Sequence, residues 1–402
     1  MTASVREYRK EDEDRARMIW SVAFRGGAPY PPERTIPLPD EETFVAMAND
    51  RVAGAYRILS TAVTCRGALF NCGGISAVAV APEDRKRHVG RAMMTHAVQH
   101  MHESGQHIAN LRASHEVFYR RYGWECCGRD YRISCPVARF PRLECPLPIR
   151  QWDVAESEKD ITLVPEEAWH ELNAAYEKFS FKYSGMAMRK SFRWSRIKAV
   201  QGSPARVYAA GDPVEAYMVI RFTHSTIGMG RDMDLEAIEF VWSTREGYQS
   251  LLSTLAGVGI NFTTISWPEP SNGPFLSSEW FTRGMTTKLA NPSLFRVLDV
   301  PGVLRGLSTE QSGTFTMAID DEILPANRGP WRVSFSPNGV EVEPTRSGDL
   351  KLDIRQVSQA ILGEPGLADL LEHGFVKPAS EEPVQAATAL LSPKTTYSLE
   401  YF

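Results

Sequence analysis

The feature that most constrains the fold is a pattern that occurs twice along the chain: a strand, a helix, one or two glycines and a second strand. Apolar residues recur at helical spacing between strands of small or β-branched residues. Two copies of one such arrangement predict two mixed α/β domains of related fold. The first copy comprises strand 73–80, helix 89–104 and strand 108–113, and the second comprises strand 238–241, helix 245–256 and strand 260–267.

The composition excludes several classes of protein. With 402 residues, 43% of them hydrophobic and 23% charged, the chain has the composition of a folded protein with two or three domains. Its net charge of −4 provides no overall basic field for nucleic acid or anionic lipid. Its six cysteines show no paired C-x-x-C with zinc spacing, so we expect no metal. No apolar run approaches the roughly 18 residues that a membrane span needs, so we expect a cytoplasmic protein.

The rest of the chain divides at two changes in composition. The proline-rich stretch Arg139–Pro148 predicts a linker between a first domain at 1–140 and a second at 149–290. From 291 to 402, alternating strands followed by a short helix predict a smaller α+β domain. The chain stops at "YSLEYF", which we interpret as a strand whose last residue is Phe402.

The first strand and its helix meet at a concentration of positive charge. A helix that begins directly after a strand points free backbone N–H groups outward, and its dipole favours an anion such as phosphate. Basic side chains nearby would add charge-assisted hydrogen bonds. A solvated helix end is the other interpretation, because the phosphate motifs G-x-x-x-x-G-K-S/T and G-x-G-x-x-G are both absent. The side chains concerned are Arg85, Lys86, Arg87, His88 and Arg91.

The residues around this junction resemble the acetyl-CoA motif of the GNAT acetyltransferases. In that family a V-x-V-x-P strand precedes Q/R-x-x-G-x-G/A; here Val78–Pro82 precedes Arg85–Gly90, with His88 at the usual first glycine. The resemblance implies that backbone N–H groups of Arg85–Gly90 bind the pyrophosphate, and that the strand splays from its neighbour and pairs with pantetheine. The alternating alanines of the strand leave room for such a ligand, although a crowded sheet face would explain them equally well. The residues that the resemblance assigns to acetyl-CoA are Val78, Ala79, Val80, Arg85, Lys86, Arg87, His88, Val89, Gly90, Arg91 and Ser114.

A second resemblance lies in "SHEVFYRRYGWE", residues 114–125. The F-Y-x-R-x-G-aromatic pattern is similar to the GNAT segment whose tyrosine protonates the departing CoA thiolate, and Tyr119 occupies that position. A thiol of pKa ~8.5 leaves more easily when a phenol of pKa ~10 can donate a proton to it. Tyr122 is the competing candidate, but it falls at the aromatic packing position before Gly123. The resemblance therefore implies Tyr119 as the general acid.

The whole layout resembles the Eis-type (enhanced intracellular survival) N-acetyltransferases. It implies a mixed α/β (α+β) chain with an active GNAT domain, a degenerate second one and a C-terminal domain similar to sterol carrier proteins. Members of that family assemble as hexamers, acetylate amines including aminoglycosides, and use the terminal carboxylate as a base, which here implies Phe402. The resemblance also implies that Trp20, Phe24 and Glu400 contact the acceptor. A terminal carboxylate has an ordinary pKa near ~3.5, so burial or a relaying water must assist it, and a terminus that merely closes a sheet is the other interpretation.

The function expected from this resemblance is acetyl-CoA-dependent N-acetylation of a primary amine on an aminoglycoside, a polyamine or a lysine-like acceptor. The protein is expected to be a homo-oligomer that uses neither metal nor nucleic acid. Two alternatives stay open: a non-catalytic acyl-CoA- or lipid-binding protein, which the third domain suggests, and an acyltransferase acting on a macromolecule. The acidic net charge disfavours an RNA-borne donor.

Overall fold

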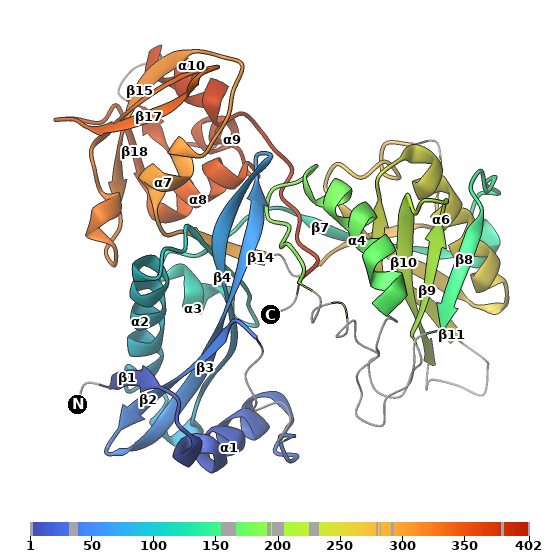
Figure 1. The fold of residues 1–402 in the computed structure, drawn as a ribbon, viewed down its shortest axis with the longest axis horizontal. Coiled ribbons are helices and arrows are strands. Elements are labelled where there is room, and N and C mark those ends of the chain that lie inside the picture. The colour runs from blue at the N-terminus through green and yellow to red at the C-terminus, as the bar shows by residue number, and fades with distance from the viewer. Residues whose placement is uncertain are drawn as a thin grey trace. The chain divides into compact units, whose positions relative to one another are not determined.

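The computed structural model shows three β-sheets with helices packed against them (Figure 1). This arrangement confirms the predicted mixed α/β fold class. The residues that the structure describes are 3–31, 39–153, 166–190, 194, 205–224, 233–278, 280–281, 283–290, 293–378 and 382–400.

The chain forms two compact units that do not follow sequence order. Each unit contains segments from distant parts of the chain, whereas the three expected domains are continuous ranges. That division into three domains stays a proposal. Unit 1 comprises Met1–Cys127, Pro292–Lys394 and Glu400–Phe402, and unit 2 comprises Gly128–Asn291 and Thr395–Leu399.

Unit 1 contains a sheet in the order β1-β2-β3-β4-β5-β14-β6, in which β14 comes from a much later part of the chain. Side chains that alternate along β2 pack in turn against α1 and α2: Val45 shares a core with Trp20, and Phe44 shares one with Met93. The two helices therefore cover opposite faces of the sheet. The elements are β1 (Ser4–Glu7), α1 (Glu13–Phe24), β2 (Glu41–Ala48), β3 (Arg51–Cys65), β4 (Ala68–Val80), α2 (Val89–Glu103), β5 (Ile108–Arg112), α3 (Glu116–Arg120), β6 (Glu125–Cys126) and β14 (Ser293–Val297).

Two-residue turns join the three long strands of this sheet. Asn49 and Asp50 connect β2 to β3 with φ values of 52° and 57°, and Arg66 and Gly67 connect β3 to β4 with φ values of 52° and 85°. Left-handed residues at both positions match the twist of a hairpin. The hairpins bring β4, which carries the motif residues 78–80, between β3 and β5.

The later part of unit 1 is a second sheet in the order β17-β16-β15-β18-β19. Its strands alternate buried and exposed residues, as a sheet with one covered face requires. Helix α8 begins at a capping box between Asp353 and Gln356 and ends at a left-handed Gly363. The elements are α7 (Val300–Arg305), β15 (Gly313–Asp320), β16 (Trp331–Ser336), β17 (Gly339–Pro344), β18 (Leu350–Asp353), α8 (Ile354–Leu362), α9 (Leu367–Glu372), β19 (Lys377–Pro378) and α10 (Glu382–Leu390).

Unit 2 contains the third sheet, in the order β13-β7-β12-β11-β10-β9-β8. The predicted second strand–helix–strand copy is present as β11, α6 and β12. Its last strand begins later than predicted because a short 3-10 turn, Gly259–Asn261, follows the helix. The elements are β7 (Asp130–Pro136), β8 (Ile149–Asp153), α4 (Glu166–Ser180), β9 (Ala205–Ala210), β10 (Ala216–His224), β11 (Met233–Trp242), α6 (Arg245–Val258), β12 (Thr264–Pro270) and β13 (Thr286–Leu289).

The C-terminal segment corrects one expectation. Over the described residues up to Glu400, it forms no strand, and Thr396 makes only an isolated parallel bridge with Ser184. The backbone N–H of Ser184 donates to Thr395 O at 3.0 Å, and the N–H of Tyr397 donates to Ser184 O at 2.8 Å. The apolar and polar residues of this stretch are buried by packing instead of by a ladder.

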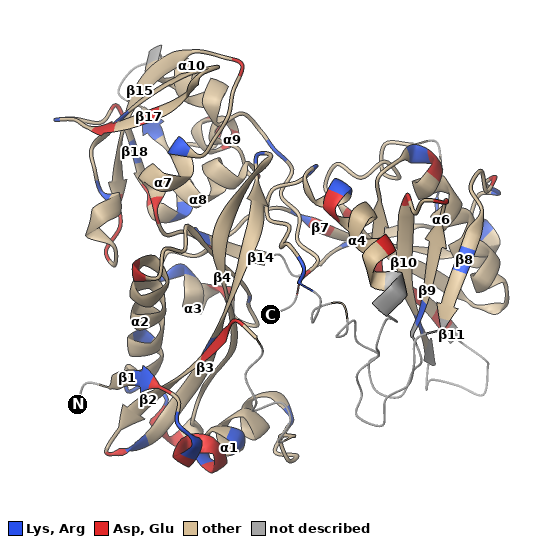
Figure 2. Cartoon of the chain, viewed as in Figure 1, with Lys and Arg blue, Asp and Glu red and all other residues tan. Residues whose placement is uncertain are grey.

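Charged residues of both signs occur throughout the described part of the chain. Figure 2 shows acidic and basic residues interspersed along both units. Within the described ranges, every helix is too short or too polar to cross a bilayer.

Candidate functional site

A bulge interrupts β4 at the middle of the predicted acetyl-CoA strand. Tyr56 of β3 lies opposite two residues, Ala77 and Val78, and Ala77 has a left-handed φ of 53°. The indole N–H of Trp20 donates to Ala77 O at 2.8 Å, which holds the bulge from the α1 side. A bulge leaves backbone groups outside the ladder and available to a ligand.

From Ile75 onward, and so across the bulge, β4 pairs with no described strand on the side of β5. The two strands pair in parallel only from Cys72 to Gly74, and Gly74 meets Asn110 in the last pair. Six further residues of β4 follow this last pair, while β5 ends at Arg112. The separated edge offers the free N–H and C=O groups with which an extended ligand can pair.

The cationic turn between β4 and α2 has the backbone of an anion site. Lys86 and His88 have φ values of 62° and 63°, and His88 is the N-cap of α2 without a side-chain cap. Alternating left-handed residues gather successive N–H groups into a concave cradle for anions. A left-handed residue at this position also explains why glycine is usual there, because glycine adopts that conformation without strain.

The side chains of the turn divide into two groups. Arg87 lies 3.6 Å from Asp84, a fully buried carboxylate that also pairs with Arg51. Arg85, Lys86 and Arg91 are exposed and make no ion pair with any residue that the structure describes. These three cations are therefore available to a phosphate, whereas Arg87 is partly neutralised.

The remaining residues that the resemblance assigns to acetyl-CoA lie in packed or exposed positions around the turn. Val89 is buried in the core beneath α2, against which Val78 and Val80 also pack, and Ala79 is buried on the α1 side. Gly90 lies against α3: a Cβ atom there would approach the ring of Phe118 to 3.0 Å. Ser114 is exposed at the end of β5.

Tyr119 lies on the five-residue helix α3, partly buried between two aromatic rings. Its ring centroid is 5.0 Å from that of Phe118 and 6.4 Å from that of Trp124. Burial raises the pKa of Tyr119 to about 12, which keeps the phenol protonated at neutral pH. Burial also raises the pKa of its competitor Tyr122, which is less buried. His115 is the exposed N-cap of α3.

The predicted acceptor residues occupy different environments. Trp20 is fully buried, with the guanidinium of Arg57 4.7 Å from its ring, whereas Phe24 is 51% exposed. Glu400 is buried, and its carbonyl accepts a hydrogen bond from Arg112 Nε at 3.2 Å. Phe402, the predicted base, lies outside the described residues. The structure therefore brings Glu400 to the end of β5 and leaves the position of Phe402 untested.

One polar residue of this region escaped the sequence interpretation. Asn110 is 1% exposed, and within the described residues neither atom of its amide has a hydrogen-bond partner. It stands in the last β4–β5 pair, where a ligand between the strands would begin. A lone amide in the apolar run "HIANLRA" is the signal that could have found it. Among the described residues, no three His, Cys, Asp or Glu side chains gather as metal ligands would.

Two segments of the chain match known protein families. Residues 4–127 match the acetyltransferase (GNAT) domain, which spans β1 to the end of β6 and contains the bulge, the cationic turn and Tyr119. Residues 300–398 match the sterol carrier protein domain.

Two N-acetyltransferases are similar to this chain over more of its length. An uncharacterized N-acetyltransferase of Streptomyces avermitilis is 24% identical over 98% of this chain and 97% of its own length. N-acetyltransferase Eis of Mycobacterium tuberculosis is 25% identical over 61% of this chain and 60% of its own length.

Solved structures share the fold. A GCN5-related N-acetyltransferase from Anabaena variabilis aligns over 100% of both chains with a TM-score of 0.87 and 18% identity, and Eis1 from Mycobacterium abscessus over 100% of both with a TM-score of 0.80 and 20% identity. Residues 4–127 therefore form an acetyltransferase (GNAT) domain, and the chain as a whole is similar to N-acetyltransferases, Eis-type proteins among them.

Proposed function

We propose that the protein transfers the acetyl group of acetyl-CoA directly to a primary amine, with Tyr119 as general acid and the terminal carboxylate of Phe402 as general base. The observation that carries the proposal is the uncapped start of α2 behind two left-handed residues, Lys86 and His88. That cradle suits a pyrophosphate, and it stands at the end of a bulged strand whose free edge suits pantetheine.

In this proposal the donor is held mainly by backbone. N–H groups of Arg85–Gly90 and the side chains of Arg85, Lys86 and Arg91 bind the pyrophosphate. The bulge at Ala77 and Val78 directs a backbone N–H of β4 toward the thioester carbonyl, where it would stabilise the negative charge that develops during attack. Asn110 would hydrogen-bond a polar group at the inner end of the same slot.

The chemistry then requires one acid and one base. The amine nitrogen bonds to the acetyl carbon while the bond from that carbon to sulfur breaks, and Tyr119 gives its proton to the departing sulfur. The proton that the amine loses goes to the carboxylate of Phe402, directly or through a water molecule. Burial raises the pKa of Tyr119 to about 12, which keeps the phenol in its acid form at neutral pH, able to hydrogen-bond to the sulfur while the bond from carbon to sulfur breaks.

The acceptor is expected to be cationic before it loses its proton. The buried residue Glu400, which the Arg112 contact holds at the end of β5, supplies an acidic side chain close to the chain terminus. An aminoglycoside, a polyamine or a lysine-like amine fits this charge. By resemblance to the Eis-type family, we propose a hexameric assembly in the cytoplasm.

Thiol release from acetyl-CoA tests the proposal with spermidine, an aminoglycoside such as kanamycin and Nα-acetyl-lysine as acceptors. The untagged and N-terminally tagged proteins should turn over at least one of these amines. A C-terminal tag, or deletion of Phe402, should abolish transfer while acetyl-CoA binding, measured by calorimetry, is unchanged. Normal turnover of the C-terminally tagged protein would remove the carboxylate from the mechanism and leave His115 or an internal carboxylate as base. Absence of thiol release with every amine would reject this acceptor class.

A further inference from the structure

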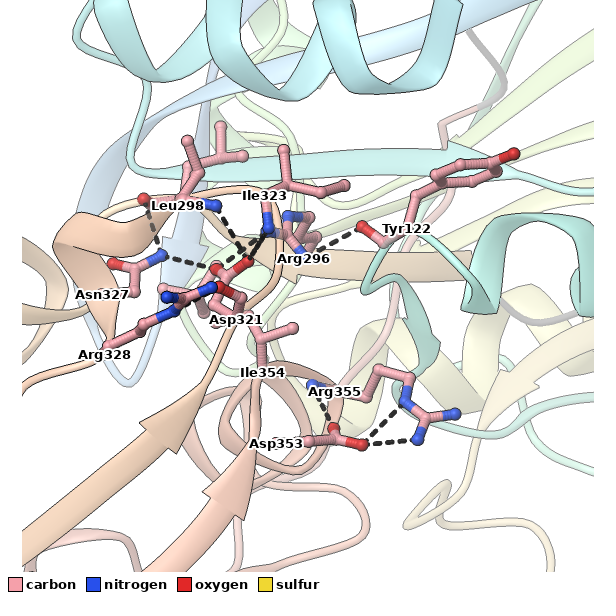
Figure 3. A network of polar contacts seen from close by, with 12 residues as sticks. Tyr122, Arg296, Leu298, Asp321, Ile323, Asn327, Arg328, Asp353, Ile354 and Arg355 are labelled. Carbon is pink, nitrogen blue, oxygen red and sulfur yellow. Dashed lines mark hydrogen bonds and ion pairs between the residues drawn. The ribbon is translucent and has the colours of Figure 1, made fainter. Parts of the chain in front are cut away.

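The turn that follows Tyr119 is anchored by an arginine from a distant part of unit 1. Arg296 of β14 is 1% exposed, and its Nη1 donates to the carbonyl oxygen of Tyr122 at 2.8 Å (Figure 3). The N–H of Tyr122 in turn donates to Tyr119 O at 2.9 Å. One hydrogen-bonded turn therefore separates the arginine from the proposed general acid.

Gly123 is the residue that lets the guanidinium approach so closely. Its φ is 86°, and a Cβ atom at this position would lie 1.5 Å from Arg296 Nη1 and 2.8 Å from Ile354 of α8. A side chain at 123 would displace the guanidinium, in addition to the strain of a left-handed backbone. The glycine of the F-Y-x-R-x-G motif thus leaves the space in which Arg296 contacts the turn after α3.

Arg296 is itself fixed by the sterol carrier part of the chain. Its Nη2 makes a two-pronged pair with the carboxylate of Asp321, at 2.7 and 2.8 Å (Figure 3). Asp321 also accepts hydrogen bonds from the backbone N–H groups of Ile323 and Leu324 and from the side chain of Asn327, all at 3.0 Å. A buried pair with every oxygen occupied allows little freedom to either partner.

The same turn of the carrier part packs against the core on which Tyr119 also lies. Leu324 is 5% exposed in the core that contains Trp124 and Met93, and Ile323 and Tyr119 both pack against that core. Polar and apolar contacts therefore connect the carrier part to α3 on one side of the acetyltransferase sheet.

We propose that Arg296, held by Asp321, is a positioning residue for Tyr119, and that the sterol carrier part of unit 1 sets the place of the general acid. The inference rests on the proposed function of Tyr119. Proton donation to sulfur requires hydrogen-bond reach, and a displacement of ~1 Å at the reacting groups can cost ~100-fold in rate. A guanidinium that clamps Tyr122 O and Asp321 together limits such displacement.

The test compares Arg296→Lys and Asp321→Asn with wild type. Lysine keeps the charge for Asp321 but cannot bridge to Tyr122 O at the same time, whereas asparagine keeps acceptors for the backbone and removes the charge. For Arg296→Lys we expect kcat to fall ~10–100-fold while the KM for acetyl-CoA changes less than about threefold. Arg305→Lys is the matched control: Arg305 of α7 contacts Val342 O at 2.8 Å within the carrier part, and its replacement should leave kcat unchanged.

A double variant separates positioning from general damage. If Arg296 acts through Tyr119, then Arg296→Lys combined with Tyr119→Phe should be no slower than Tyr119→Phe alone. Multiplication of the two losses, or an unchanged kcat in Arg296→Lys, would overturn the inference while the role of Tyr119 stands. Full activity of Tyr119→Phe would overturn both. Acetyl-CoA stoichiometry, measured by calorimetry for each variant, reports the folded fraction, and Asp321→Asn repeats the test should Arg296→Lys fold poorly.

Discussion

The two strand–helix junctions of the chain contain the same elements but differ in the side chains that lie inside them. β4 and β11 each run antiparallel to the preceding strand with a bulge, at Ala77 and Val78 in β4 and at Ile238 in β11, and each pairs in parallel with the following strand over three residues. The residue after the bulge differs. In β4 it is Ala79, a small side chain, whereas in β11 it is the buried Glu239.

Glu239 fills the second junction with a polar cluster. Arg189 makes a two-pronged pair with its carboxylate at 2.7 and 2.8 Å, the hydroxyl of Tyr217 donates to the same carboxylate, and the guanidinium lies 4.3 Å from the ring of Tyr176. The corresponding helix start is also closed, because the side chain of Thr244 accepts a hydrogen bond from Gly247 N–H. Because the space beside the strand is filled, it leaves no room for pantetheine. Because the helix start is capped, fewer of its N–H groups are free for a phosphate.

A cavity does border the second junction. It has a volume of about 630 Å³ and is lined by Trp242, Tyr248 and Trp280, with Lys182 and Arg245 among its other residues. The cap at Thr244 distinguishes it from the first junction, where the N–H groups of α2 are free of side-chain caps. Similar folds can thus differ in whether the junction is open, as proposed for the donor in the first copy, or filled by side chains, as in the second.

The largest expected effect is that of replacing Tyr119, because the proposed acetyl transfer takes place in the first copy alone. Tyr119→Phe should lower kcat ~10²–10⁴-fold and leave the dissociation constant of acetyl-CoA unchanged, since one well-placed acid contributes about that factor. Stopped assays of thiol release and calorimetry measure the two quantities. Tyr122→Phe is the control and should retain most activity; the reverse result would move the acid to Tyr122.

The pH dependence follows from the same residue. Burial raises the pKa of Tyr119 to about 12, so its protonated form persists as the pH rises. The wild-type kcat should therefore show no loss attributable to this acid between about pH 7 and pH 10. An alkaline decline in that range that disappears in Tyr119→Phe would contradict the raised pKa.

The next effect is on stability and belongs to the second copy. Glu239→Gln breaks a buried ion pair, so it should lower the free energy of unfolding by about 3–5 kcal/mol, because the buried Arg189 loses the carboxylate that balances its charge. Urea unfolding followed by tryptophan fluorescence measures the loss. Glu236→Gln, on the same strand but in more exposed pairs with Arg221 and Arg132, should cost less than Glu239→Gln. Loss of acetyl-CoA binding in Glu239→Gln would show that the second copy takes part in donor binding.

A smaller effect separates the two helix starts. Replacement of Arg85 and Arg91 by Ala should raise the KM for acetyl-CoA ~10–100-fold, or ~1.4–2.7 kcal/mol for both contacts together, because the two side chains are exposed and solvent screens their attraction to phosphate. Arg245→Ala, at the start of α6, should leave that KM unchanged. Calorimetry should also find one acetyl-CoA per chain. A second binding event that Arg245→Ala abolishes would mean that both junctions bind the donor.

The smallest effect tests whether backbone or imidazole binds phosphate. His88→Gly keeps the left-handed conformation and relieves a strain of ~1 kcal/mol, so acetyl-CoA affinity should stay within about threefold and the melting temperature should rise slightly. Thermal unfolding and calorimetry measure both. An affinity loss of more than about tenfold would assign the imidazole a direct phosphate contact.

Local pattern was sufficient for much of this protein. The strand–turn–helix order around residues 76–94, the five cationic or imidazole side chains and the motif around Tyr119 are encoded within a few residues of one another, so they can be interpreted without the fold. The fold class followed from the repeated strand–helix–strand arrangement for the same reason.

Tertiary structure decided what local pattern could not express. Strand β14 joins the acetyltransferase sheet from about 180 residues downstream and brings Arg296 to the turn after Tyr119. Thr395–Leu399 belong to unit 2 and Glu400 to unit 1, although the stretch "YSLEYF" has the composition of one strand. In the second copy, Glu239 follows the bulge and fills the space beside it because it pairs with Arg189, about 50 residues away in the sequence. Such contacts join side chains far apart in sequence, and burial, not spacing, determines which of them form.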